Sequence, residues 1–130
     1  MKILVCISKV PDTTSKIKFV DNNTKFDENG VQYVVNPYDE WYALVRALEL
    51  VEASGGTVTT ITVGNSTDDP TIRKALAIGA NDAVRIDADP TDSFFVAKQI
   101  SEYAKNENFD IVMTGKETID YNGAQIGGML

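Results

Sequence analysis

Four short runs of aliphatic and β-branched residues alternate with helix-like patterns along the sequence. The runs are residues 3–7, 57–63, 83–86 and 109–113. A continuous apolar run bounded by polar residues is typical of a strand that is buried on both faces of a parallel sheet. Strands that alternate with helices predict an α/β fold with a parallel sheet and right-handed crossovers. Ligands in such folds bind at the carboxyl ends of the strands, so the loops there are the places to search for a site.

The first helix pattern has several start signals in a row. Asn36 is a good N-cap residue, Pro37 suits the first helical position, and Asp39 and Glu40 would lie in the first turn. The pattern ends at residues 54–56, Ser-Gly-Gly. Spacings of three and four residues predict one face that packs on the sheet, made of Tyr38, Trp41, Leu44, Val45, Leu48 and Val51.

Two further helices are expected after the second and third strands. The second begins with Asp69 as its cap and Pro70 behind it, and ends near Gly79. The third begins with Asp92 as its cap and ends near residues 105–108. Their predicted core-facing residues are Ile72, Ala75 and Leu76 for the second, and Phe95, Val96, Ile100 and Tyr103 for the third. Residues 16–35, between the first strand and the first helix, favour small hairpins.

Composition excludes several classes of function. The chain has 12 Lys and Arg against 19 Asp and Glu, a formal charge of −7, no His and one Cys. It offers no basic stripe for nucleic acid, no imidazole triad, no zinc-finger spacing and no intrachain disulfide. Cys6 lies in an apolar run and is expected to be a small core residue. No apolar run approaches the length that spans a bilayer, so we expect no membrane insertion and a cytoplasmic location.

Three polar loops are predicted at the carboxyl edge of the sheet: residues 8–12, 64–67 and 114–123. In the third, Gly115 and Gly123 would allow close backbone approach to a ligand, and Lys116 adds a charge. Residues 122–125 could open a helix whose free amides attract phosphate. Neither a Walker loop nor a G-x-G-x-x-G fingerprint is present. The residues alone therefore indicate an α/β domain with a mononucleotide site, or ordinary βα turns.

Four motifs in register resemble the β subunit of electron transfer flavoprotein across essentially the whole chain. The motifs are residues 3–12, ILVCISKVPD; residues 36–40, NPYDE; residues 73–82, RKALAIGAND; and residues 115–125, GKETIDYNGAQ. The resemblance implies a Rossmann-like, adenine nucleotide α-hydrolase-like fold. It also implies a heterodimer in which an α subunit holds most of a redox-active FAD and the β subunit binds a structural AMP.

In that family the β subunit is not itself an enzyme: electrons reach the FAD from dehydrogenases and leave to an acceptor, and no catalytic residues are implied here. The resemblance puts backbone groups near Cys6 and Val63 at the adenine, and residues 123–126 at the phosphate. The nucleotide contacts that it implies in this chain are Cys6, Asn36, Pro37, Tyr38, Asp39, Val63, Gly115, Lys116, Glu117, Thr118, Ile119, Asp120, Tyr121, Asn122, Gly123, Ala124, Gln125 and Ile126.

Two alternatives stay open at this point. One is a second FAD in the AMP site, as in flavin-based bifurcating members of the family. The other is a nucleotide-binding signalling domain similar to universal stress proteins. Family β subunits run well past 130 residues, so we expect residues 1–130 to form a single nucleotide-binding domain that lacks the family's C-terminal part.

Overall fold

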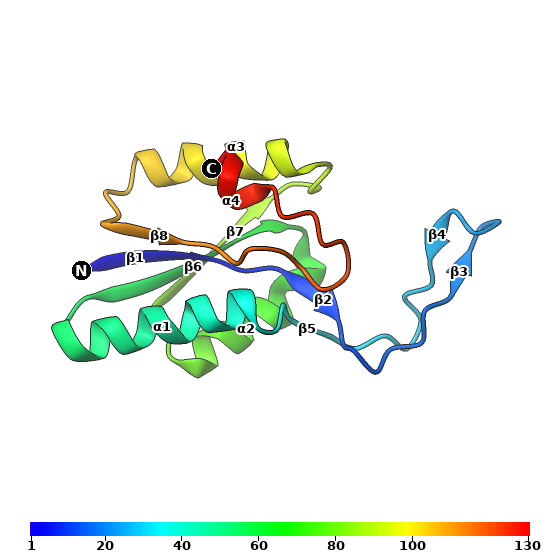
Figure 1. Ribbon diagram of the computed structural model, residues 1–130, viewed down its shortest axis with the longest axis horizontal. Coiled ribbons are helices and arrows are strands. Elements are labelled where there is room, and N and C mark those ends of the chain that lie inside the picture. The colour runs from blue at the N-terminus through cyan, green and yellow to red at the C-terminus, as the bar shows by residue number, and fades with distance from the viewer.

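A computed structural model describes residues 1–130, and its centre is a parallel sheet of four strands in the order β7-β6-β1-β8. The strands are β1 (Lys2–Cys6), β6 (Thr57–Gly64), β7 (Asp82–Asp87) and β8 (Ile111–Met113). Helices α1 (Asp39–Ser54) and α2 (Asp69–Ile78) cover one face of the sheet. Helix α3 (Ser93–Lys105) and the short helix α4 (Ile126–Met129) lie on the other face (Figure 1). The predicted parallel α/β fold is confirmed.

The core consists of two apolar clusters, one on each face of the sheet. Strand β1 lies between them, and its Ile3, Leu4 and Val5 are completely buried. Because side chains alternate along a strand, Ile3 and Val5 pack under α1 and α2, whereas Leu4 and Cys6 pack under α3. Cys6 is therefore a core residue, as predicted.

The start of α1 differs from the sequence prediction. The helix begins at Asp39 and its N-cap position is Tyr38, which has φ 64° and ψ −96° and gives no side-chain cap. Asn36 does not cap this helix, because its side-chain amide is hydrogen-bonded to a distant loop. Tyr38 was expected to face the sheet but is 62% exposed, since it precedes the helix with a left-handed backbone.

The start of α2 was also placed wrongly. A 3₁₀ helix, η1 (Ser66–Asp68), comes directly before it, and Asp69 is the first residue of α2 instead of its cap. The Asp69 carboxylate accepts a hydrogen bond from Arg85 instead (2.8 Å). Leu76 was expected in the core and is 40% exposed. The predicted end of α2 at Gly79 (φ 139°) is confirmed, as is the Asp92 cap of α3, which accepts from the Phe95 N–H.

The segment between β1 and α1 forms an arm. Strand β2 (Lys9–Pro11) pairs antiparallel with β5 (Tyr33–Val35), and farther out β3 (Phe19–Val20) pairs with β4 (Lys25–Phe26). The outer hairpin projects well away from the sheet (Figure 1). The predicted hairpins are confirmed, but residues 9–11 are a strand and not the loop that was expected.

Candidate functional site

The carboxyl ends of β1 and β8 lie side by side, at the point where the chain reverses its direction across the sheet. β1 leads through α1 to β6 on one side, whereas β8 pairs with β1 on the other. Such a switch point is where α/β sheets bind ligands. The residues that follow β8, from Thr114 on, are the long loop that the sequence singled out.

Asn36 links this loop to the segment that follows β1 through hydrogen bonds. Its side chain is fully buried; Nδ2 donates to the Glu117 carbonyl at 2.9 Å, and Oδ1 accepts from the Ile119 N–H at 3.1 Å. Its own N–H donates to the Ser8 carbonyl at 3.0 Å. Asp39 adds a further contact, since its carboxylate accepts from the Glu117 N–H at 3.0 Å. Asn36 and Asp39 are thus bonded directly to Glu117 and Ile119 of the loop.

Glu40 lies buried beneath the same loop and was not among the predicted site residues. Its carboxylate accepts from the Ser8 N–H at 2.8 Å and from the Ser8 hydroxyl at 2.9 Å and 3.0 Å. Burial raises its pKa from 4.5 to about 7; the Ser8 hydrogen bonds oppose this rise, and the nearby Asp120 and Asp39 carboxylates add to it. The spacing of residues in the helix could have predicted that Glu40 is buried, because Glu40, Leu44 and Ala47 lie on the same buried face of α1.

Gly115 lies where the long loop packs closely against the start of α1, and this contact leaves no room for a side chain. A Cβ at this position would lie 2.7 Å from Glu40 Cγ and 3.0 Å from Asp39 Cβ. The absence of a side chain therefore lets the loop pack on the start of α1. This differs from the sequence interpretation, in which Gly115 made room for a ligand. Gly123, in contrast, has open space around it, since a Cβ there would meet no other atom within 4 Å.

The outer part of the loop presents free backbone amides. The Asn122 N–H donates to the Thr118 carbonyl at 2.9 Å, but the N–H groups of residues 123–126 donate to no group of the chain. Residues 120–125 are exposed, with Tyr121 at 87%. Asn122 and Ala124 both have φ 51°, a left-handed backbone conformation that is uncommon for residues other than glycine. Helix α4 begins only at Ile126, one residue beyond the predicted opening segment.

The remaining predicted site residues divide between the two faces of the sheet. Cys6 and Val63 are buried in the same cluster under α3. Burial, and then the Glu40 charge, raise the pKa of the Cys6 thiol to about 12, so it is neutral and unreactive at physiological pH. Pro37 and Tyr38 line a groove on the α1–α2 side. The Lys116 side chain is 77% exposed and its Nζ lies 3.8 Å from the Glu117 carboxylate.

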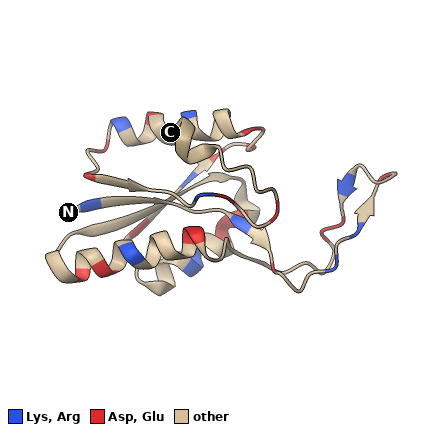
Figure 2. Cartoon of the chain, in the orientation of Figure 1, with Lys and Arg blue, Asp and Glu red and all other residues tan.

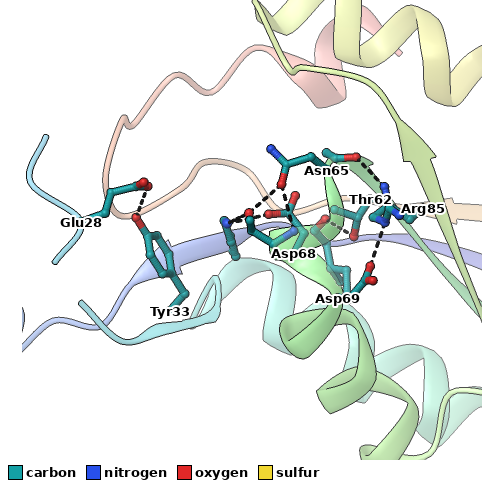
Figure 3. A network of polar contacts seen from close by, with 11 residues as sticks. Glu28, Tyr33, Thr62, Asn65, Asp68, Asp69 and Arg85 are labelled. Carbon is teal, nitrogen blue, oxygen red and sulfur yellow. Dashed lines mark hydrogen bonds and ion pairs between the residues drawn. The ribbon is translucent and has the colours of Figure 1, made fainter. Parts of the chain in front are cut away.

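The second predicted loop, residues 64–67, is folded into a polar network (Figure 3). Asp68 pairs with Lys9 at 2.7 Å, and Arg85 contacts both Asp69 and Asp87 at 2.8 Å. Asn65 accepts from the N–H and the hydroxyl of Thr67. A Cβ on Gly64 would collide with the Asp68 carboxylate. These polar groups hold β2, β6 and β7 together and are satisfied within the chain.

Two other features are absent from the structure. No group of three or more His, Cys, Asp and Glu residues is placed to hold a metal ion. None of the helices has the length and hydropathy to cross a membrane.

The family model described as "Electron transfer flavoprotein domain" matches residues 23–130. The chain belongs to the electron transfer flavoprotein family. The predicted resemblance, and the fold that it implied, are confirmed. Family membership argues against the alternative of a signalling domain similar to universal stress proteins. The two interpretations within this family, AMP or a second FAD in the site, remain.

Curated relatives show which subunit the chain resembles. It is 34% identical to the electron transfer flavoprotein subunit beta of Bacillus subtilis over 134 residues, which cover 100% of this chain and 51% of that protein. It is 39% identical to the protein FixA of Azorhizobium caulinodans, with 98% and 47% covered. It is 38% identical to the mitochondrial subunit beta of Oryza sativa subsp. indica, with 100% and 53% covered. The chain is thus a homologue of subunit beta and spans about half the length of these relatives.

Proposed function

We propose that this chain is the nucleotide-binding part of an electron transfer flavoprotein β subunit. Residues 1–130 would form one unit that holds a structural AMP, and an α subunit would carry the FAD. The flavin, when bound, supplies the redox chemistry of passing electrons from dehydrogenases to an acceptor. The residues of this chain would bind the adenylate and position the subunits, without a catalytic group of their own.

The run of free N–H groups at residues 123–126 is the observation that carries the proposal. Backbone donors that have no partner in the chain and lie in an exposed turn are suited to phosphate oxygens. Asn36 and Asp39 hold the inner part of the same loop through Glu117 and Ile119, so the donors are presented from a fixed base. At the other end of the site, backbone groups near Cys6 and Val63 would contact the adenine.

Substitutions in the exposed turn test the phosphate assignment. Gly123→Leu together with Ala124→Leu should abolish nucleotide retention by the purified complex, because the new side chains would cover the free amides. Neither residue is buried, so the melting temperature of the nucleotide-free protein should change little. Gly128→Leu is the matched control, since Gly128 is also exposed and has nothing within 4 Å. Full retention in the double variant would refute the phosphate assignment.

Co-purification tests the proposed α subunit partner, and nucleotide extraction tests which nucleotides are bound. The chain should purify with a larger FAD-carrying polypeptide, and acid extraction of the complex should release AMP and FAD in a 1:1 ratio. Two FAD and no AMP would instead support the bifurcating form. A homodimer that binds ATP, with no FAD-carrying partner, would overturn the proposal. A cytoplasmic location is part of the proposal, and cell fractionation can test it.

A further inference from the structure

The sequence contains two Asn-Gly pairs, and both lie in exposed segments. Asn29-Gly30 is in the arm between β1 and α1, and Asn122-Gly123 is in the outer part of the long loop. Asn is among the residues that degrade chemically in proteins. It reacts most readily before Gly, because the attacking group is the backbone nitrogen of the next residue and Gly has no Cβ to hinder it. What surrounds each pair therefore decides whether it reacts.

Nothing in the chain restrains the groups that would react at Asn122-Gly123. The Gly123 N–H donates to no group of the chain. The Asn122 side-chain amide makes no hydrogen bond either, whereas the side chains of Asn65 and Asn81 are both held by one or more. Both residues of the pair are exposed, and a Cβ on Gly123 would meet no other atom within 4 Å. The attacking nitrogen and the side-chain amide that it attacks are thus open to solvent.

The pair has the atoms for deamidation through a cyclic imide, with water as the only co-reactant. The Gly123 nitrogen loses its proton to solvent and bonds to Asn122 Cγ. The Asn122 Cγ–Nδ2 bond breaks, and Nδ2 takes up a proton from solvent and leaves as ammonia. Water then cleaves either bond from an imide carbonyl carbon to the Gly123 nitrogen. Cleavage at Cγ leaves Asp, and cleavage at the main-chain carbonyl carbon leaves isoaspartate, in which the peptide continues through the side chain.

Deamidation would put a negative charge beside the free amides of the outer turn. Residues 121–130 carry no charged side chain, and Figure 2 shows this segment in tan. No cation of the segment would therefore offset a carboxylate at position 122. An Asp side chain also accepts from N–H groups a few residues away, so it would compete for those of residues 123–126. Isoaspartate adds a backbone carbon and displaces these N–H groups as well.

We propose that Asn122 is a deamidation site, that the reaction disables the anion-binding turn, and that a bound nucleotide prevents it. The Gly123 N–H that would donate to a phosphate oxygen is the same group that starts the reaction. While it donates to phosphate it does not attack Cγ, so the loaded protein is protected and the empty protein degrades. The Gly30 N–H is also free, but it lies in the arm, outside the proposed nucleotide site. Protection by nucleotide rests on the proposed function, whereas the reactivity of the empty loop does not.

Peptide mass mapping of incubated protein tests the site. The purified protein, with its partner where one co-purifies, is kept at mildly alkaline pH without nucleotide or with AMP, and the replacement of NH by oxygen is followed at both Asn-Gly pairs. With AMP at about 100 times its Kd, about 1% of the protein is free, so the loss of Asn122 should slow by at least about tenfold. The loss of Asn29 should change by less than about twofold, because AMP covers only the pair in the long loop.

Two substitutions separate the chemistry from its effect on binding. Gly123→Ala adds a methyl group where there is space and where φ is not left-handed, so the variant should fold normally and keep Asn122 after the wild type has lost it. Asn122→Asp supplies one product directly and should raise the Kd for AMP by about tenfold or more. Its matched control, Asn29→Asp, adds the same charge to the arm and should leave the Kd within about twofold.

The other outcomes each overturn a defined part. If the nucleotide-free protein loses Asn29 but keeps Asn122, the inference is overturned and the proposed function stands. If bound AMP slows the loss of both residues equally, or of neither, AMP does not cover the Gly123 N–H, and the inference fails together with the phosphate assignment. An unchanged Kd for AMP in Asn122→Asp would overturn the effect on the turn. If the protein binds no AMP at all, the proposed function is overturned and the protection with it.

Discussion

Replacing Glu40 with Gln should stabilise the protein at neutral pH and not at acid pH. The Glu40 carboxyl is 9% exposed and its pKa lies at about 7, against 4.5 for the ordinary side chain. The folded state therefore holds the proton more tightly than the unfolded state. Below pH 4.5 both states are protonated and Glu40 carries no penalty. As the pH rises from 4.5 to 7 the unfolded state ionises first, so the folded state loses stability relative to it.

The size of the change in stability follows from the two pKa values of Glu40, 4.5 for the ordinary side chain and about 7 in the folded protein. At 1.36 kcal/mol per pH unit, the rise from 4.5 to about 7 corresponds to about 3 kcal/mol that the wild type loses over this range. Gln has the same shape, and it can accept from the Ser8 N–H and donate to the Ser8 hydroxyl, but it does not titrate. The difference in free energy of unfolding, variant minus wild type, should therefore grow by about 3 kcal/mol between pH 4.5 and pH 7.5.

Urea denaturation at several pH values measures this difference. The other groups that face Glu40, which are Asp39, Asp120 and Cys6, are present in both proteins, so their titration largely cancels. Glu52→Gln, an exposed position on the same helix, is the control and should give a flat difference. If the Glu40→Gln difference also stays flat from pH 4.5 to 7.5, the carboxyl is not buried as described and the reasoning fails.

Four further substitutions test the packing around the site. Thr60→Val should raise the free energy of unfolding by about 1 kcal/mol, because the Thr60 hydroxyl is buried without a hydrogen-bond partner. Thr62→Val should lower it by about as much, because the Thr62 hydroxyl donates to the Ile7 carbonyl at 3.0 Å; calorimetry on the two variants compares them directly. Gly64→Ala should cost about 2 kcal/mol in chemical denaturation by displacing the buried Asp68 carboxylate, and an unchanged midpoint would contradict that contact. Asn36→Ala should cost about 2–4 kcal/mol and speed amide exchange in residues 117–119, since both loop hydrogen bonds would be lost; protection equal to the wild type would show that the loop is held otherwise.

Local patterns in the sequence were sufficient for most of the fold. The β-branched runs predicted the four parallel strands, Asp92 was correctly predicted as the N-cap of α3, and Gly79 was correctly predicted as the end of α2. Each of these features depends on neighbours within a few residues. The four motifs also led to the family, which the family model and the curated relatives bear out.

Tertiary structure decided what the polar side chains of the site do. Asn36 has the sequence features of a helix cap, but its amide binds a loop 81 and 83 residues further along the chain. Gly115 looked like a ligand-facing glycine, but it makes room for Glu40 and Asp39. A capping preference is a local energy, whereas the partner that a buried amide or carboxylate finds depends on which strand ends the sheet brings together. That is set by the order β7-β6-β1-β8, which puts the end of β8 beside the end of β1 and is not written in any one segment of the chain.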